Sequence, residues 1–161
     1  MTKGQIIQNL FVRFLMEMKF ENCEFLEIWN SFVNNRKALN SKENFDFIYD
    51  YFRNFLEEEY FIMDNSCIPN KYTSAYHSHQ LKKIILPSEL QPAYESIYLK
   101  TQELRNEINK SKIKLDYLNE CFKEFPAIQF QIEFLIERRQ LELLKLESKV
   151  SVLNELIKTF N

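Results

Sequence analysis

Between residues 90 and 160, apolar residues recur in alternating steps of four and three, and one proline interrupts the series. The first series ends at Phe122 and the second begins at Ile132, with Pro126 between them. A repeat that averages 3.5 residues places side chains in one seam along a helix, as in coiled coils. Proline cannot continue a helix but suits the first turn of a new one. We therefore predict two helices of roughly 35 residues, each about 50 Å long, that form an antiparallel hairpin over residues 89–161.

One charged residue stands in this seam, whose other positions are apolar except for Thr101 and Ser111. The first series consists of Leu90, Tyr94, Ile97, Thr101, Leu104, Ile108, Ser111, Leu115, Leu118 and Phe122, and the second of Ile132, Ile136, Arg139, Leu143, Leu146, Val150, Leu153, Ile157 and Phe160. A charge at a seam position often sets the register or pairs with an acid. We expect Arg139 to pair with Glu107 or Asp116 on the opposing helix.

Both predicted helices carry more apolar side chains than one seam can bury. The surplus residues that we expect to bind a partner are Leu99, Tyr117, Phe130, Phe134, Leu141 and Leu144. Exposed apolar patches of that extent are rare on monomers. We therefore expect a homodimer in which the hairpin is the main interface.

Residues 1–76 predict a separate helical head. Broad apolar stripes indicate helices over 4–18 and 22–34, and a third that begins near Asn40 or Ser41. Asn40 followed by Glu43 has the form of a capping box. The third helix should end at the acidic residues 57–59, because negative charge opposes the helix dipole there.

A short β-hairpin is predicted to follow, with strands over 60–63 and 67–73 around the turn signal 64–66. Residues 77–88 then predict a polar connector. The expected fold class is thus mainly all-α: a three-helix head with a short β-hairpin, followed by the long helical hairpin. The chain holds 1 Gly and 4 Pro, which agrees with few turns and long elements.

The three cysteines, Cys23, Cys67 and Cys121, are odd in number and far apart. This pattern disfavours a disulfide framework or a thiolate zinc site, and it favours a reducing, cytoplasmic location. No uninterrupted apolar stretch reaches the roughly 18 residues of a membrane span, so we expect no membrane partner.

No group of residues predicts catalysis or cofactor binding. His77 and His79 lack a neighbouring acid or cysteine that would complete a metal site. The acidic residues 57–59 and Asp64 have no nucleophile or paired base beside them. The single glycine also excludes a glycine-rich phosphate loop. We expect a protein that is not an enzyme.

Residues 47–62, Phe-Ile-Tyr-Asp-Tyr-Phe-Arg-Asn-Phe-Leu-Glu-Glu-Glu-Tyr-Phe-Ile, resemble the end of a recognition helix that runs into the first wing strand of a winged-helix protein. The resemblance covers residues 4–73. It implies a DNA-binding head and a C-terminal dimerisation helix. Glu59 stands where the turn glycine of that family usually lies.

Nucleic-acid contact is assigned to polar and basic residues of the third helix and of the segment after it. The candidates are Lys42, Asn44, Tyr49, Arg53, Lys71, Lys82 and Lys83. Residues 1–64, however, hold 7 Lys or Arg against 11 Asp or Glu, a balance that repels phosphates rather than attracting them.

Two functions therefore stay open. The first is a non-enzymatic adaptor or inhibitor, whose acidic head and amphipathic hairpin dock on another protein, for example a nucleic-acid-binding one. The second is a dimeric winged-helix transcriptional regulator that binds DNA. The apolar surplus and the acidic head favour the first, whereas the order of the elements favours the second.

Overall fold

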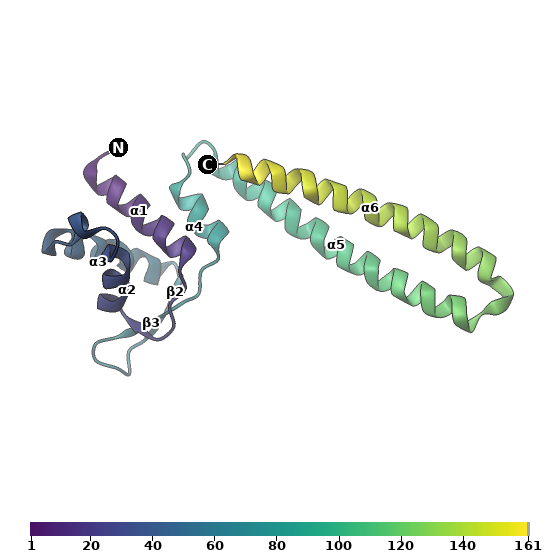
Figure 1. Cartoon of the computed structure of the whole chain (residues 1–161), viewed down its shortest axis with the longest axis horizontal. Helices are drawn as coiled ribbons and strands as arrows, with labels where there is room; N and C mark the ends of the chain where they lie inside the picture. Colours follow the sequence, from purple (N-terminus) through teal and green to yellow (C-terminus); the bar gives the residue numbers. More distant parts are fainter. Residues whose placement is uncertain (161) are drawn as a thin grey trace. The chain divides into compact units, whose positions relative to one another are not determined.

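The computed structural model describes residues 1–160 and is mainly helical, which confirms the expected fold class (Figure 1). The chain divides into two units, Met1–Ile85 and the residues from Leu86 on. We call the first unit the head and the second the hairpin. Each unit is described by itself below.

The helices of the head begin at side-chain caps that the sequence supplies. These helices are α1 (Lys3–Glu17), α2 (Phe25–Val33), the short 3-10 helix η1 (Lys37–Leu39), α3 (Lys42–Glu57) and α4 (Ser78–Ile85). Thr2 and Gln5 form a capping box at α1. At α3 the cap is Ser41, whose hydroxyl accepts from the Asn44 amide at 3.2 Å. The capping box expected from Asn40 is therefore wrong, because the residue after it holds the capping position.

Helix α3 ends in a Schellman motif rather than by fraying. The Tyr60 amide donates to the Phe55 carbonyl at 2.8 Å, and the Glu59 amide donates to the Leu56 carbonyl at 3.2 Å. Glu59 has a φ of 58°, the left-handed conformation that this motif requires. The rings of Phe55 and Tyr60 stack at 5.7 Å and supply the hydrophobic contact that usually accompanies the motif.

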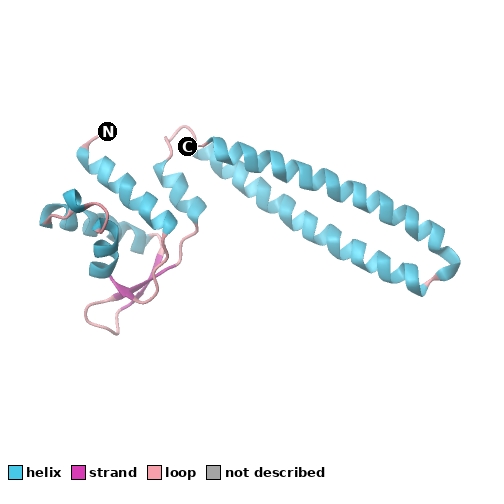
Figure 2. Cartoon of the chain, viewed as in Figure 1, coloured by secondary structure: helices cyan, strands magenta, loops and turns pink. Residues whose placement is uncertain are grey.

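Three short strands form an antiparallel sheet in the order β1-β3-β2 (Figure 2). The strands are β1 (Cys23–Glu24), β2 (Phe61–Asp64) and β3 (Lys71–Ser74). The predicted β-hairpin is present as β2 and β3. Strand β1 was placed by the sequence inside a helix over 22–34, and α2 instead begins at Phe25. The left-handed Asn22, with a φ of 53°, separates this strand from what precedes it.

Aromatic side chains fill the core of the head. Phe11, Phe32 and Phe52 are fully buried. Phe11 meets Phe32 edge-on at 5.2 Å between ring centroids. The single tryptophan of the chain, Trp29, is only 3% exposed. Sheet and helices share this core, since Phe52 of α3 meets Tyr72 of β3 at 5.0 Å.

The segment 77–88, expected to be a polar connector, contains helix α4. This helix packs along α1 (Figure 1), and its Leu81 is fully buried in the core of the head. Just before α4, the Tyr76 hydroxyl donates to the Met18 carbonyl at 2.5 Å. The polar residues of the segment concealed this helix, although Leu81, Ile84 and Ile85 have the spacing of one helix face.

The C-terminal unit is an antiparallel pair of long helices, as the apolar repeat predicts. Helices α5 (Gln91–Glu124) and α6 (Gln129–Thr159) are joined by the short 3-10 helix η2 (Pro126–Ile128). Tyr94 near the start of α5 meets Phe160 after α6, at 5.4 Å between ring centroids. One side of the pair is bridged by polar groups: Arg105 Nη2 donates to Asn154 Oδ1 at 3.3 Å, and Lys112 Nζ lies 3.8 Å from Glu147 Oε1.

Among residues 1–160, no helix combines the length and the apolar character that crossing a bilayer requires.

Candidate association surface

Helix α6 buries its own seam only in part. Among its 31 residues only Ile132 is buried, at 4% exposure. Seam residues such as Leu143, Leu146 and Val150 are half-buried. Two helices alone cover each other along one narrow strip, so side chains at the strip's edges stay in contact with water.

A second row of apolar side chains runs along α6, away from the seam. We call Phe130, Phe134, Leu141 and Leu144 the outer row; they are 82%, 63%, 54% and 59% exposed. Their spacing of four, seven and three residues follows the same 3.5-residue period and gives one continuous face. Leu99 and Tyr117 of α5 are also exposed, at 52% and 64%. All six residues expected to bind a partner therefore lie at the surface of the hairpin.

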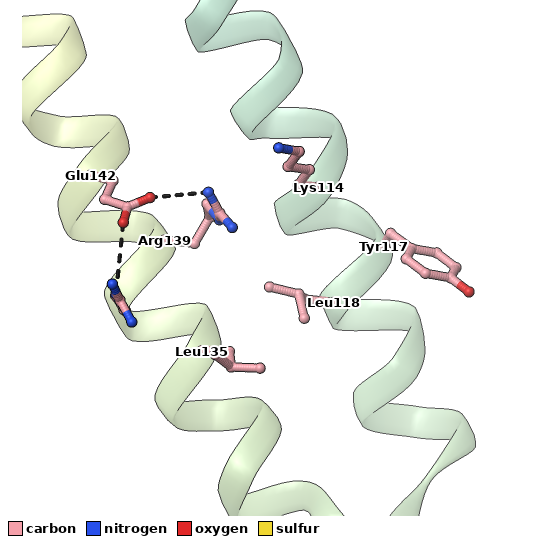
Figure 3. A pocket seen from close by; sticks show the side chains of 7 residues that line it. Lys114, Tyr117, Leu118, Leu135, Arg139 and Glu142 are labelled. Carbon is pink, nitrogen blue, oxygen red and sulfur yellow. Dashed lines mark hydrogen bonds and ion pairs between the residues drawn. The ribbon is translucent and has the colours of Figure 1, made fainter.

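A groove of about 420 Å³ lies between α5 and α6, on the half of the hairpin nearer the turn (Figure 3). It is lined by Lys114, Tyr117, Leu118, Leu135, Arg138, Arg139 and Glu142. Figure 3 shows Leu118 and Leu135 pointing toward each other across the groove, whereas Tyr117 points away from α6. The groove thus joins apolar walls to a cluster of charges.

Arg139 pairs within its own helix. Its Nη1 donates to Glu142 Oε2 at 3.0 Å, and Arg138 Nε lies 3.7 Å from the other carboxylate oxygen of Glu142 (Figure 3). The predicted pairing with Glu107 or Asp116 on α5 is therefore wrong. The reason is distance along the helix: Glu142 is three residues away on the same face, so its carboxylate is within reach without crossing the seam.

The residues assigned to nucleic-acid contact do not form one basic surface. Asn44 is only 7% exposed, and its side-chain amide donates to the Leu39 carbonyl at 2.9 Å. The side chain of Asn44 is therefore engaged inside the head. Lys42 pairs with Asp46 at 2.6 Å. Lys71 lies directly opposite both Glu24 and Asp64 in the sheet register.

The remaining candidates are scattered. Arg53 and Tyr49 are exposed on α3, whereas Lys82 and Lys83 are half-buried on α4. The exposed charged side chains of α3 are two basic residues and four acidic ones: Lys42, Arg53, Glu43, Asp46, Asp50 and Glu57. The helix that would face a nucleic acid is therefore acidic on balance.

An aromatic pocket opens between α2, α3 and the β2–β3 loop. Its volume is about 470 Å³, and it is lined by Glu24, Phe25, Leu26, Phe45, Tyr49, Pro69, Asn70 and Tyr72. Of this set, the sequence singled out Tyr49 alone. The others come from four separate segments, and only the folded head brings them together.

Among residues 1–160, no three His, Cys, Asp or Glu side chains are placed to hold a metal ion. The rings of His77 and His79 stack on each other at 6.0 Å. Asp64 accepts hydrogen bonds from the hydroxyl and amide of Ser66 at 2.6 and 2.9 Å. These bonds lower the pKa of Asp64 and tie it to the turn.

Comparison of the chain with protein-family models, with curated proteins and with solved structures finds no match.

Proposed function

We propose that this chain is a non-enzymatic protein-binding protein, an adaptor or inhibitor that associates through its hairpin and presents the acidic surface of α3 in the head to a partner. The observation that carries the proposal is the burial pattern of α6, in which one residue of 31 is buried and four large apolar side chains form the outer row. A surface of this kind favours contact with another helix.

The size of the outer row supports a homodimer as the basic assembly. Fully burying a leucine or phenylalanine side chain contributes about 1.5–3 kcal/mol. Four such residues on each of two chains would contribute enough to offset the loss of free motion on association, about 4–15 kcal/mol. The groove of Figure 3 adds apolar area beside the half-buried seam.

The charge of the exposed α3 surface supports a protein partner rather than a nucleic acid. Helix α3 exposes four acids against two bases, and one of those bases, Lys42, is held by Asp46. Nucleic-acid affinity depends on releasing counterions from phosphates by basic groups. An acidic face instead attracts a basic protein surface.

A second candidate function is the dimeric winged-helix transcriptional regulator. It is favoured by the order α1, β1, α2, α3, β2, β3 and by a three-stranded sheet in the order β1-β3-β2. Fold likeness does not fix function, and the charges of α3 oppose this candidate.

Fluorescence anisotropy of the full chain with two labelled probes distinguishes the two functions. One probe is a 15-residue peptide rich in Lys and Arg, and the other is a random-sequence 25-base-pair DNA duplex. The proposal expects binding of the peptide, reduced by salt, and no binding of the duplex at 50 mM salt. Duplex binding whose affinity falls steeply between 50 and 200 mM salt would overturn the proposal in favour of the regulator.

A further inference from the structure

We infer that the aromatic pocket of the head binds a cationic side chain, arginine or lysine, from a basic protein segment. The inference rests on the proposed function and deepens it, since it names the residue type that the acidic head recognises. The pocket is formed within the head alone, by α2, α3, β3 and the β2–β3 loop.

Four rings supply the chemistry of the pocket. Phe25 is the centre of the cluster: its centroid lies 4.9 Å from that of Tyr49 and 5.4 Å from that of Phe45. Phe45 and Tyr49 are almost parallel, at 2° and 6.4 Å. Tyr72 lies on the β3 side. Aromatic faces attract a cation through the negative charge above and below the ring, and they attract it more strongly where water is partly excluded.

The walls are held in place by the core beneath them. Phe25 is 6% exposed and Tyr72 4% exposed, and both contact the fully buried Phe52. Phe45 also meets Trp29 edge-on at 5.5 Å. Tyr49, at 39% exposure, forms the accessible rim. A rigid aromatic wall loses little entropy when a ligand binds, which favours a specific site.

The charges in and around the pocket favour a cation as its ligand. Glu24 is the only charged residue in the lining. Lys71 lies opposite Glu24 in the sheet but is also opposite Asp64, so one base faces two acids. On α3, Asp46 and Asp50 flank Tyr49 in sequence, and Lys42 is engaged by Asp46. Arg53, one turn further along α3, is the nearest opposing charge on that helix.

Neither a phosphate nor a purely apolar anchor fits these observations as well. A phosphate would meet Glu24 and ring faces, which repel negative charge. An apolar side chain would cover part of the Glu24 carboxylate without pairing with it, which costs free energy. A guanidinium or ammonium group satisfies the carboxylate and the rings together.

The test uses two small probes of nearly equal shape. Argininamide carries the guanidinium charge, and citrullinamide replaces it with a neutral urea group. Each is titrated into the full chain while the ring signals of Phe25, Phe45, Tyr49 and Tyr72 are followed by NMR. We expect argininamide to shift these signals and to bind about fivefold or more tightly than citrullinamide.

Matched variants locate the effect. Tyr49→Leu should weaken argininamide binding about fivefold, whereas Tyr49→Phe keeps the ring and should retain most of it. Glu24→Gln should weaken it as well. Phe125→Leu removes an exposed aromatic ring of the hairpin and should leave binding unchanged. The fluorescence of Trp29, which contacts Phe45, reports whether each head variant is folded.

Equal binding of the two probes, absence of ring shifts, or full affinity in the Tyr49→Leu variant would each overturn the inference. The outcome is separable from that of the proposed function. If the basic 15-residue peptide binds but argininamide does not shift the four rings, the pocket assignment fails while the protein-binding function stands. If the peptide does not bind and the duplex does, the proposed function fails.

Discussion

Glu59 adopts the backbone conformation and makes the hydrogen bonds of a helix-ending motif in which another residue type is usual. It occupies the left-handed position of the Schellman motif after α3, with a φ of 58° and the expected amide bonds on both sides. Glycine is the usual residue there, because a Cβ is strained in this conformation. The sequence places Glu59 where a winged-helix protein usually has that glycine, and the backbone adopts the conformation regardless.

Replacing Glu59 by glycine should therefore stabilise the head. We expect Glu59→Gly to raise the free energy of unfolding by about 0.5–1 kcal/mol, because relief of strain exceeds the added entropy of the unfolded chain. The measurement is urea unfolding followed by Trp29 fluorescence. Glu59→Ala removes the same charge but keeps a Cβ, so it should show no such gain. A matched loss is expected for Glu58→Gly, since Glu58 has an ordinary φ of −85°. Equal effects at the two positions would contradict the strain argument.

At the scale of elements, the sequence predicted the helices that carry a long apolar repeat and missed two short elements. The hairpin follows from a 3.5-residue apolar period sustained over some 70 residues, and α1 and α3 follow from broad stripes. Strand β1 has two residues, too few for a period, and the apolar face of α4 is short and stands among polar residues. The aromatic pocket could not be predicted. In the sequence Phe25, Phe45 and Tyr72 have the pattern of core residues, and only the folded chain brings them around one opening.

Arg139 marks the weakest point of the hairpin seam. It occupies a seam position at 36% side-chain exposure and pairs only along its own helix, with Glu142. An exposed pair of this kind contributes little, whereas an apolar side chain at that position would add buried area. We expect Arg139→Leu to stabilise the hairpin by about 1 kcal/mol, measured as a higher thermal midpoint by circular dichroism at 222 nm.

Arg138→Leu is the matched control for this change. Arg138 contacts the same Glu142 but is 69% exposed and lies outside the seam. Its replacement should leave the midpoint almost unchanged. A lower midpoint for Arg139→Leu would instead show that the arginine cluster of the groove holds the hairpin in its assembled form.

For the molecule as a whole, the two units should respond differently to protein concentration. The head has its own aromatic core, which includes Trp29. The hairpin leaves the outer row exposed and much of its seam only half-buried. If the hairpin associates with a second copy, its stability depends on mass action, whereas that of the head does not.

Urea unfolding at 1 and 100 µM protein separates the two responses. The tryptophan of the chain lies in the head, so its fluorescence reports that unit. Helices α5 and α6 contain 34 and 31 residues and dominate the circular dichroism signal. A hundredfold rise in concentration should stabilise the associated hairpin by about 2.7 kcal/mol and move the dichroism transition to higher urea, while the fluorescence transition stays in place. The Phe134→Glu/Leu141→Glu double variant should abolish the shift, because it places two charges within the outer row. A dichroism transition that does not move with concentration in the unmodified chain would show that the outer row faces water in an isolated monomer, and self-association through the hairpin would then be wrong.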